Sequence, residues 1–437
     1  MRMVTKMAYA APTVGLAGLG LPLLIYLPNY YGTVVGLPLG LVGLAFLVAR
    51  LADIIADPLA AVVLDNTRSA FGRFRLWLVI GTPFLIVSVF GLFMPPKGAS
   101  ATYLSLCLAG TYAAWSLCSV AHVAWGGSLS DDYDERNAIF AWAQAFFMVG
   151  GLAITALPLL PALKATPAAT VPAMGWFIMA ATPVGVALAV LLVREPPAAW
   201  TRRPAWRDYA RLLAQGDVAR LLGSSFLTSL ALYGSGAVFF FYYPLFHGLS
   251  PLQTASLLFV LKLGAIAGGY LWSMLGTLME KHRALALGFA AQALLYPVVH
   301  LLPWSSPKVG MVILAGFGIT LSAAPVLMRS MMADLGDQWR LSSGTDQLGA
   351  LSALFSIIDK LAAAVAPALA LMALDRAGFN PQGAEQTGQA TTALSVAAIW
   401  VPAVLCLLAI PLVRGHRLTA DRHQAVRREL ALLEAGG

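Results

Sequence analysis

Two aspartates lie four residues apart in an otherwise apolar stretch, and their type and spacing suggest chemistry. On a helix, Asp53 and Asp57 share one face, one turn apart. Carboxylates in a membrane helix are costly to bury and normally face a bundle interior or a water-filled cavity. Two carboxylates beside a hydroxyl suit a monovalent cation or a shared proton, and Ser119 is the candidate hydroxyl ligand. The alternative is a structural ion pair with Arg50 or Lys360.

A lysine lies in the middle of a later apolar stretch. Lys360, in ALFSIIDKLAAAVAPALA, needs an anionic partner because an unpaired buried charge is strongly unfavourable. We predict a coupling role, in which this lysine bridges to the aspartate pair and is released when a cation binds. The alternative is neutralisation by Asp359, although adjacent helix residues do not face each other. Lys262 and Arg329 are further charges that either snorkel or line a cavity.

The composition of the chain is that of a membrane protein. Hydrophobic residues make up 59% of its 437 residues and charged residues only 11%, whereas a soluble domain carries about a quarter charged residues. The mean hydropathy is +0.77. The net charge of +8 comes from basic residues dispersed among apolar spans, so we expect no nucleic-acid partner. Three cysteines lie in apolar runs and fit neither a disulfide framework nor a metal site.

Apolar stretches of spanning length recur throughout the chain. A spanning helix needs about 20 apolar residues, and this template predicts an all-α polytopic membrane protein with twelve transmembrane helices. The first apolar run is longer than a signal-peptide core of about 7–15 residues, so we interpret it as a retained span. The predicted spans are residues 8–32, 37–64, 76–94, 102–128, 138–160, 171–193, 217–246, 251–279, 284–302, 309–333, 344–374 and 391–413.

The longest charged interruption falls near the middle of the chain. It predicts an N-terminal six-helix bundle at 1–193, a cytoplasmic linker at 194–216, a C-terminal six-helix bundle at 217–414 and a cytoplasmic tail at 415–437. Basic residues concentrate in one set of loops, which places both termini in the cytoplasm. Two pseudo-symmetric six-helix halves are the architecture of a large superfamily of secondary transporters, whose substrate site lies between the halves.

A charged hairpin follows the aspartate helix. Its residues Asp65, Arg68, Gly72, Arg73 and Arg75 predict a conformational latch, in which glycine allows a tight turn and the aspartate pairs with an arginine. Such a latch would open and close the cytoplasmic side in alternation. The alternative is an ordinary solvated loop.

Aromatic and imidazole side chains are the candidate substrate ligands. Rings in the spans could stack on a substrate, although most aromatic residues there serve packing. A lone histidine in an apolar helix is either a substrate ligand or a hydrogen-bonded structural residue. We find no nucleotide-binding loop and no nucleophile–base pair, so we expect neither an enzyme nor a cofactor. The candidate substrate ligands are Tyr9, His122, Trp125 and Trp142.

The chain resembles the glycoside–pentoside–hexuronide cation symporters, the melibiose-permease branch of the major facilitator superfamily. The resemblance lies in GLPLGLVGLAFLVARLADIIADP and the adjoining DNTRSAFGRFRLW. SDDYDER at 130–136 is similar to the segment after that family's fourth helix, and MMADLGD at 331–337 is similar to the end of its tenth helix.

The resemblance implies the major facilitator fold and cation-coupled symport of a small solute across the plasma (inner) membrane by alternating access. It implies that Asp53 and Asp57 bind the cation, H+ or Na+, that Ser119 supplies a hydroxyl ligand and that Lys360 is the lysine of helix eleven. The hairpin matches the superfamily's latch motif. We expect a monomer whose partners are a small-molecule substrate and the lipid bilayer.

Three positions depart from the sugar permeases of that family. Ala17 replaces an acidic residue of helix one, His122 replaces Asp or Asn of helix four, and Ala143 replaces an arginine of helix five. Because a sugar needs several polar partners, a less polar, amphiphilic or anionic solute, as in lysolipid carriers, is the alternative to a sugar-like substrate. Ala56 stands where sodium-using members often have asparagine, which favours H+ over Na+. A second hypothesis is an uncoupled facilitator in which the aspartate pair is structural.

Overall fold

The protein is helical throughout the part that the structure describes. The computed structural model describes residues 2–130, 132–163, 165–195, 206–304, 306–343, 348–383, 385–415 and 420–435. Within these ranges every regular element is a helix.

Eleven of the described helices are long and apolar enough to cross a membrane, and the total is twelve if the bent pair Gly216–Ala237 and Phe239–His247 is one span. The prediction of an all-α, twelve-helix membrane protein is therefore confirmed, with one span bent by 61°. The other spans are Met3–Val35, Leu39–Leu64, Arg73–Phe93, Ala101–Ser128, Asp134–Leu159, Pro167–Leu192, Pro251–Leu278, Lys281–Leu301, Pro307–Leu341, Leu348–Arg376 and Gly388–Arg414.

The chain divides into two compact units. The first consists of Met1–Trp200, Gly236–Ala255 and Pro367–Leu394, and the second of Thr201–Ser235, Ser256–Ala366 and Ser395–Gly437. Later segments join the first unit through direct contacts. Gln382 Nε2 donates to the Thr33 carbonyl at 3.1 Å, and the rings of Phe241 and Phe379 meet at 5.4 Å. The predicted division at 194–216 stays a prediction.

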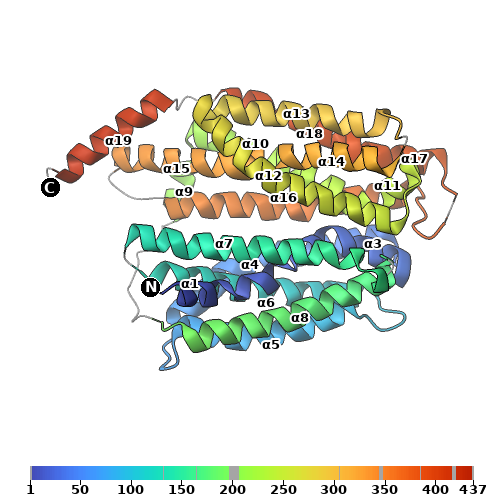
Figure 1. Ribbon diagram of the computed structural model, residues 1–437, viewed down its shortest axis with the longest axis horizontal. Coiled ribbons are helices and arrows are strands. Elements are labelled where there is room, and N and C mark those ends of the chain that lie inside the picture. Colours follow the sequence, from blue (N-terminus) through green and yellow to red (C-terminus); the bar gives the residue numbers. More distant parts are fainter. Residues whose placement is uncertain are drawn as a thin grey trace. The chain divides into compact units, whose positions relative to one another are not determined.

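The first unit is built around four long helices. α4 packs along α6, and α5 lies beside both α6 and α8 (Figure 1). The helices of this unit are α1 (Met3–Ala10), α2 (Pro12–Ala17), η1 (Pro22–Tyr26), α3 (Leu27–Tyr30), η2 (Tyr31–Val35), α4 (Leu39–Asn66), α5 (Arg73–Phe93), α6 (Ala101–Ser128), α7 (Tyr133–Ala156), η3 (Leu157–Leu159), η4 (Pro161–Leu163), α8 (Pro167–Leu192), α11 (Phe239–His247) and α17 (Gly388–Ser395).

The first span is broken into short pieces. Proline occupies the first or second position of α2, η1 and α3, and a proline cannot donate the backbone hydrogen bond that would continue the preceding turn. Close packing against α8 compensates. A Cβ added at Gly15 would lie 2.3 Å from Thr182 Oγ1, and one added at Gly185 would lie 2.6 Å from the Ala11 carbonyl oxygen. Only glycine lets these two backbones approach so closely.

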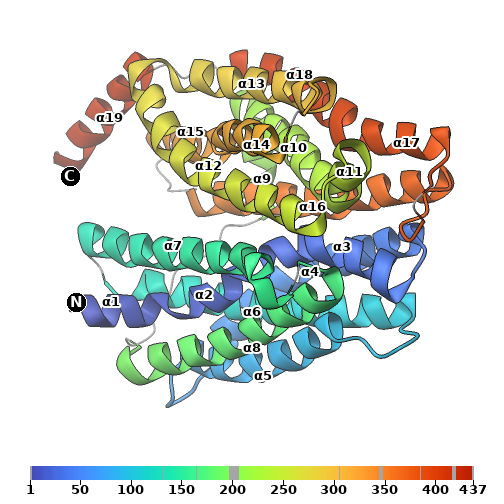
Figure 2. The same cartoon turned by 45° about the vertical axis from the view of Figure 1, so that its right-hand side comes forward.

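The second unit packs its helices on one apolar core. α13 packs against both α15 and α18 (Figure 2), and the core includes Leu285, Phe289, Leu327, Met331 and Leu351, all buried. The helices lying wholly or mostly here are α9 (Trp206–Leu213), α10 (Gly216–Ala237), α12 (Pro251–Leu278), α13 (Lys281–Leu301), α14 (Pro307–Leu321), α15 (Ala323–Ser343), α16 (Leu348–Arg376), η5 (Val396–Trp400), α18 (Val401–Arg414) and α19 (Ala420–Ala435).

The last helix is tied to the second unit by a charged cluster. His423 Nε2 on α19 lies 2.9 Å from Asp337 Oδ2 and 3.5 Å from Asp334 Oδ1, both on α15. Lys281 Nζ, at the start of α13, lies 2.7 Å from Asp334 Oδ2. These contacts hold α19 against α15.

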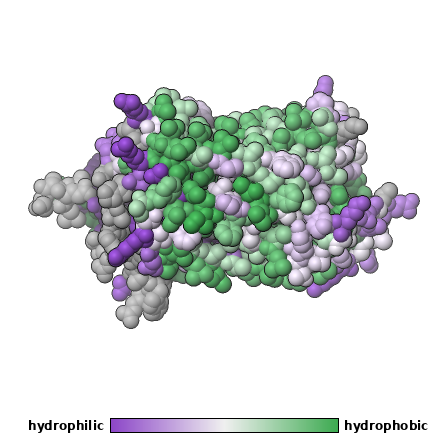
Figure 3. Space-filling model, turned by 90° about the horizontal axis from the view of Figure 1, so that it is seen from below, coloured by the Kyte–Doolittle hydropathy of each residue, from purple (hydrophilic) through white to green (hydrophobic). Residues whose placement is uncertain are grey.

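The outer surface is apolar where a bilayer would meet it. Hydrophobic residues cover the middle of the face seen in Figure 3, and hydrophilic residues gather at its two ends. On α5 and α8, large side chains such as Phe84, Val87, Trp176 and Leu191 are exposed. Apolar exposure on this scale indicates contact with lipid.

Candidate functional site

The two aspartates of α4 meet a hydroxyl of α6. Ser116 Oγ lies 2.6 Å from Asp53 Oδ1 and is also hydrogen-bonded to Asp57 Oδ1. The i, i+4 spacing puts both carboxylates on the face of α4 that packs on α6, so the three oxygens converge. Asp53 is only 3% exposed and Ser116 7%, while Asp57 is half-buried. We name Asp53, Asp57 and Ser116 the aspartate site.

Arg50 adds a positive charge to the aspartate site. Its Nη1 donates to Asp53 Oδ2 at 3.1 Å, and its guanidinium lies 4.4 Å from the Tyr112 ring centroid and 5.8 Å from that of Trp115. The ion pair that the sequence suggested as an alternative is therefore present, beside the carboxylate–hydroxyl contacts. The formal charges of Arg50, Asp53 and Asp57 sum to −1.

The hydroxyl in the structure is not the one named from the sequence. Ser116 makes the contacts to both carboxylates, whereas the sequence analysis named Ser119, three residues later on the same helix and partly exposed. Both residues lie on similar faces of α6 because 3.6 residues make one turn. Ligation by Ser119 stays a prediction.

Lys360 and Asp359 belong to α16 in the second unit. Asp359 accepts hydrogen bonds from Ser229 Oγ at 2.9 Å and from the Tyr233 hydroxyl at 2.8 Å. Two hydroxyl donors thus stabilise the carboxylate that the sequence offered as a local partner of the lysine. The coupling role of Lys360 stays a prediction.

Three of the four candidate substrate ligands form one buried cluster. The Tyr9 hydroxyl donates to the His122 carbonyl oxygen at 2.9 Å, and His122 Nε2 lies 2.7 Å from the Tyr9 carbonyl oxygen. The two rings stack at 4.2 Å, and Trp125 meets Tyr9 edge-on at 6.1 Å. Since a carbonyl only accepts, His122 carries its proton on Nε2. The cluster joins α1 to α6, and substrate binding by these residues stays a prediction.

The other positions singled out for substrate, Trp142, Ala17 and Ala143, also belong to the first unit. Trp142 on α7 is half-buried and meets Phe146 edge-on at 6.2 Å. Ala17 and Ala143 are buried, and the Ala143 carbonyl accepts a hydrogen bond from Thr13 Oγ1 at 3.0 Å. These alanine positions contribute packing and backbone contacts in the first unit.

The hairpin before α5 is held by a carboxylate that sequence reasoning missed. Glu195 accepts hydrogen bonds from the backbone N–H groups of Arg73 at 2.8 Å, Phe74 at 3.1 Å and Arg75 at 3.1 Å. A carboxylate at a helix N-terminus satisfies unpaired donors and interacts favourably with the helix dipole. The signal was a lone glutamate directly after the sixth apolar span.

The remaining hairpin residues have separate contacts. Gly72 has φ +103°, a conformation that favours glycine. Arg75 Nη2 donates to the Val190 carbonyl at 2.6 Å, and the Arg73 guanidinium lies 4.3 Å from the Phe74 ring centroid. Arg68 is exposed, and the Asp65 side chain lies outside what the structure describes. The latch stays a prediction.

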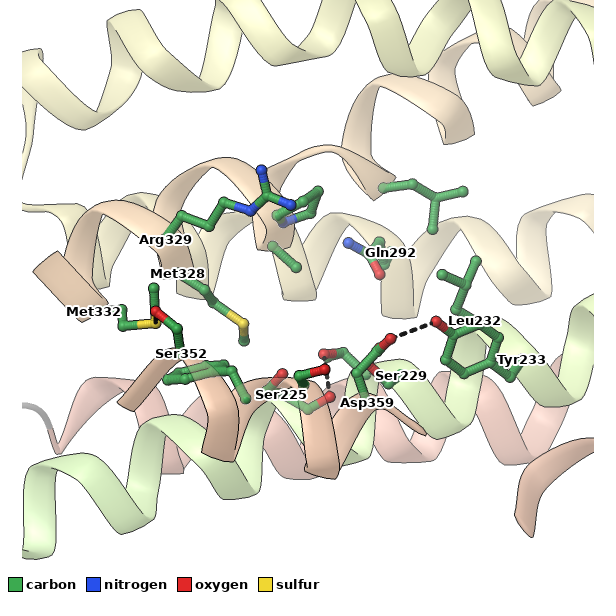
Figure 4. Close-up of a pocket in the computed structure, with 16 residues that line it drawn as sticks. Ser225, Ser229, Leu232, Tyr233, Gln292, Met328, Arg329, Met332, Ser352 and Asp359 are labelled. Atoms are coloured by element: carbon green, nitrogen blue, oxygen red, sulfur yellow. Dashed lines mark hydrogen bonds between the residues drawn. The ribbon is translucent and has the colours of Figure 1, made fainter. Parts of the chain in front are cut away.

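A cavity of about 650 Å³ opens within the second unit. Its walls come from α10, α13, α14, α15 and α16. Figure 4 shows Gln292 and Arg329 on one side of it and Ser225, Tyr233 and Asp359 on the other. The sequence had suggested that Arg329 either snorkels or lines a cavity, and it lines this one. The lining residues are Ser225, Thr228, Ser229, Leu232, Tyr233, Gln292, Leu321, Ala324, Pro325, Met328, Arg329, Met332, Ser352, Phe355, Ser356 and Asp359.

Comparisons with known proteins agree with this fold. A family model described as MFS/sugar transport protein matches residues 8–420. The inner membrane symporter YicJ of Escherichia coli (strain K12) is 32% identical over 142 residues, which span 31% of this chain and only 30% of that protein. Sodium-dependent lysophosphatidylcholine symporter 1-B of Danio rerio is 23% identical, over 88% of this chain and 81% of the length of that symporter. The crystal structure of the nucleoside transporter NupG superposes with a TM-score of 0.70 at 12% identity, over 94% of this chain and 99% of that one.

Proposed function

The chain belongs to the MFS/sugar transport protein family of multi-pass membrane transporters, and we propose that it is a cation-coupled symporter that moves a small solute by alternating access. The family predicted from the sequence is thereby confirmed. The observation that carries the proposal is the aspartate site, in which two carboxylates of α4 converge on one hydroxyl of α6. Such an oxygen cluster in a membrane protein suits a proton or a small monovalent cation.

Hydrogen-bond geometry supports a proton as the coupling ion. The Ser116 hydroxyl has one hydrogen and donates to one carboxylate at a time, yet its oxygen makes hydrogen-bond contacts with both Asp53 and Asp57. The second contact is a hydrogen bond only when the other carboxyl group is protonated. Ala56, which has no amide oxygen to offer Na+, supports the same choice.

Lys360 is the proposed coupling residue. Its ammonium would neutralise the aspartate pair when no cation is bound, and cation binding would release it. Substrate would bind near Tyr9, His122, Trp125 and Trp142. The hairpin capped by Glu195 would act as the cytoplasmic latch. We place the protein, a monomer, in the plasma membrane with both termini in the cytoplasm.

A second candidate is an uncoupled carrier of a less polar or amphiphilic solute. The ion pair between Arg50 and Asp53 favours it, because a carboxylate neutralised by arginine serves structure without any cation. The name of the Danio rerio relative, a lysophosphatidylcholine symporter, supports an amphiphilic solute. In this candidate, neutralising Asp57 would leave equilibration of the solute unchanged.

Uptake by proteoliposomes tests the proposal. A mixed pool of sugars, organic acids and amphiphiles is offered with and without a pH or Na+ gradient, and mass spectrometry reads what accumulates. Asp57→Asn should abolish accumulation driven by the gradient and preserve exchange of the same solute at equilibrium. Asp375→Asn, which changes an exposed carboxylate on α16, is the matched control. If the parent protein only equilibrates the solute under either gradient, and Asp57→Asn equilibrates it equally well, the protein is the uncoupled carrier.

A further inference from the structure

The cavity of the second unit holds two opposite charges that do not pair with each other. Arg329 comes from α15 and Asp359 from α16, and both line the cavity. Figure 4 shows the two side chains on opposite sides of the space. Both helices belong to membrane spans, where an ionisable residue is expensive and usually marks a substrate or ion pathway. The charges therefore call for a reason other than mutual neutralisation.

Arg329 offers donors that the described protein leaves unused. Among the described residues its guanidinium has neither an ion-pair nor a hydrogen-bond partner. An arginine side chain carries five N–H donors, stays charged and matches a carboxylate or phosphate in a bidentate arrangement. An acidic group in the cavity would satisfy this side chain better than a hydroxyl would.

Asp359 offers acceptor capacity on the other side. Ser229 Oγ and the Tyr233 hydroxyl each donate to one of its oxygens, at 2.9 and 2.8 Å. A carboxylate has about four lone-pair positions, so positions remain for a donor brought by a ligand. The two hydroxyls fix the orientation of the carboxylate in advance, which lowers the entropic cost of binding.

Apolar side chains line the space around these two groups. Leu232, Met328, Met332 and Phe355 face the cavity, and methionine adapts its shape to differently shaped apolar partners. A cavity of about 650 Å³ lies in the size range of small-molecule sites. A fully hydroxylated solute would leave these four side chains without apolar contact.

We propose that this cavity binds an organic anion that also carries a hydrogen-bond donor and an apolar portion. Arg329 holds the acidic group, Asp359 accepts from the hydroxyl or ammonium donor, and the apolar portion lies on the methionines and Phe355. The proposal rests on the proposed transport function and assigns the carrier an anion site in the second unit, separate from the proposed substrate ligands Tyr9, His122, Trp125 and Trp142. It is independent of which ion drives transport.

Three probes with the same phenyl group separate these contacts. 3-Phenyllactate has the acid and the hydroxyl, 3-phenyllactamide lacks the charge, and 3-phenylpropionate lacks the hydroxyl. Calorimetry on the purified full-length protein in lipid nanodiscs should give the tightest binding for 3-phenyllactate. Arg329→Gln should weaken the two acids by on the order of 10- to 100-fold and the amide by less than about threefold. Asp359→Asn should weaken the two hydroxyl probes and leave 3-phenylpropionate nearly unchanged.

Two further variants serve as controls for the binding test. Arg329→Lys keeps the charge and should restore part of the binding of both acids. Arg376→Gln removes an exposed arginine at the end of α16 and should change no affinity. Unchanged melting temperatures would exclude misfolding as the cause of lost binding.

Distinct outcomes overturn the proposal. The proposal is wrong if 3-phenyllactate and 3-phenyllactamide bind with equal affinity. It is also wrong if Arg329→Gln binds the two acids as tightly as the parent protein does, or if no probe binds. Failure of the cation-coupling proposal has a different signature, because it is read from gradient-driven accumulation in Asp57→Asn and leaves binding to this cavity intact.

Discussion

Replacing Ser116 by alanine tests whether the aspartate site holds a cation. With a proton bound, the hydroxyl donates to one carboxylate and accepts from the other carboxyl group. Without the proton it only donates. The substitution therefore removes two hydrogen bonds from the proton-bound state and one from the empty state, a difference of one bond. Because Ser116 is 7% exposed, little water can replace it, and the loss is about 1.4 kcal/mol, or tenfold in apparent cation affinity.

The assay is the pH dependence of gradient-driven uptake in proteoliposomes, using a solute that the mixed pool identifies. Ser116→Ala should move the midpoint of uptake by about one pH unit toward acid, because a weaker site needs more protons. Ser119→Ala, three residues further on α6, should change apparent affinity by less than about twofold. If Ser119→Ala shifts the midpoint and Ser116→Ala does not, the hydroxyl named from the sequence is the ligand and the reasoning from the structure fails. If neither variant has an effect, the site is structural.

Two further predictions concern the ends of helices. Glu195→Gln should lower the free energy of unfolding by about 1 kcal/mol, because an amide caps the first turn of α5 less well than a carboxylate. The measurement is the melting temperature, with Glu429→Gln as the control variant. Equal melting temperatures for the two variants would contradict the prediction. His423→Ala should loosen α19 from Asp337, a half-exposed contact of about 0.7 kcal/mol, so that its amides exchange about threefold faster by mass spectrometry. Arg428→Ala, an exposed change on the same helix, should leave this exchange unchanged.

The spans could be predicted from the sequence because the length of an apolar stretch depends only on consecutive residues. The predicted span 251–279 and the observed Pro251–Leu278 differ by one residue. The bend between α10 and α11 was not predicted, since its residues are as apolar as those of a straight span. Glu195 was missed for a related reason. Its partners lie more than 100 residues earlier in the chain, and no local pattern reports such a contact.

The choice between Ser116 and Ser119 shows the limit of such reasoning most clearly. Helical periodicity places both residues on similar faces of α6, but they differ by about 4.5 Å along the helix axis. The axial position of α6 against α4 is set by packing along the whole interface, including the stacking of Arg50 on Tyr112. Sequence periodicity can therefore predict which face of a helix a polar side chain occupies, whereas its axial register against a neighbouring helix comes from the structure.

The two aspartates have unequal environments, and this inequality suggests a division of roles. Asp53 is almost fully buried, accepts from Arg50 at 3.1 Å and from Ser116 at 2.6 Å, and is thereby fixed in place. Asp57 is half-buried and shares the Ser116 hydroxyl. Asp53 already has an ion-pair partner in Arg50, whereas Asp57 is the more accessible of the two carboxylates. We therefore propose that Asp53 with Arg50 forms the fixed part of the site, and that Asp57 would be the group whose charge changes in coupled transport. For this reason Asp57 is the aspartate whose neutralisation separates coupling from structure.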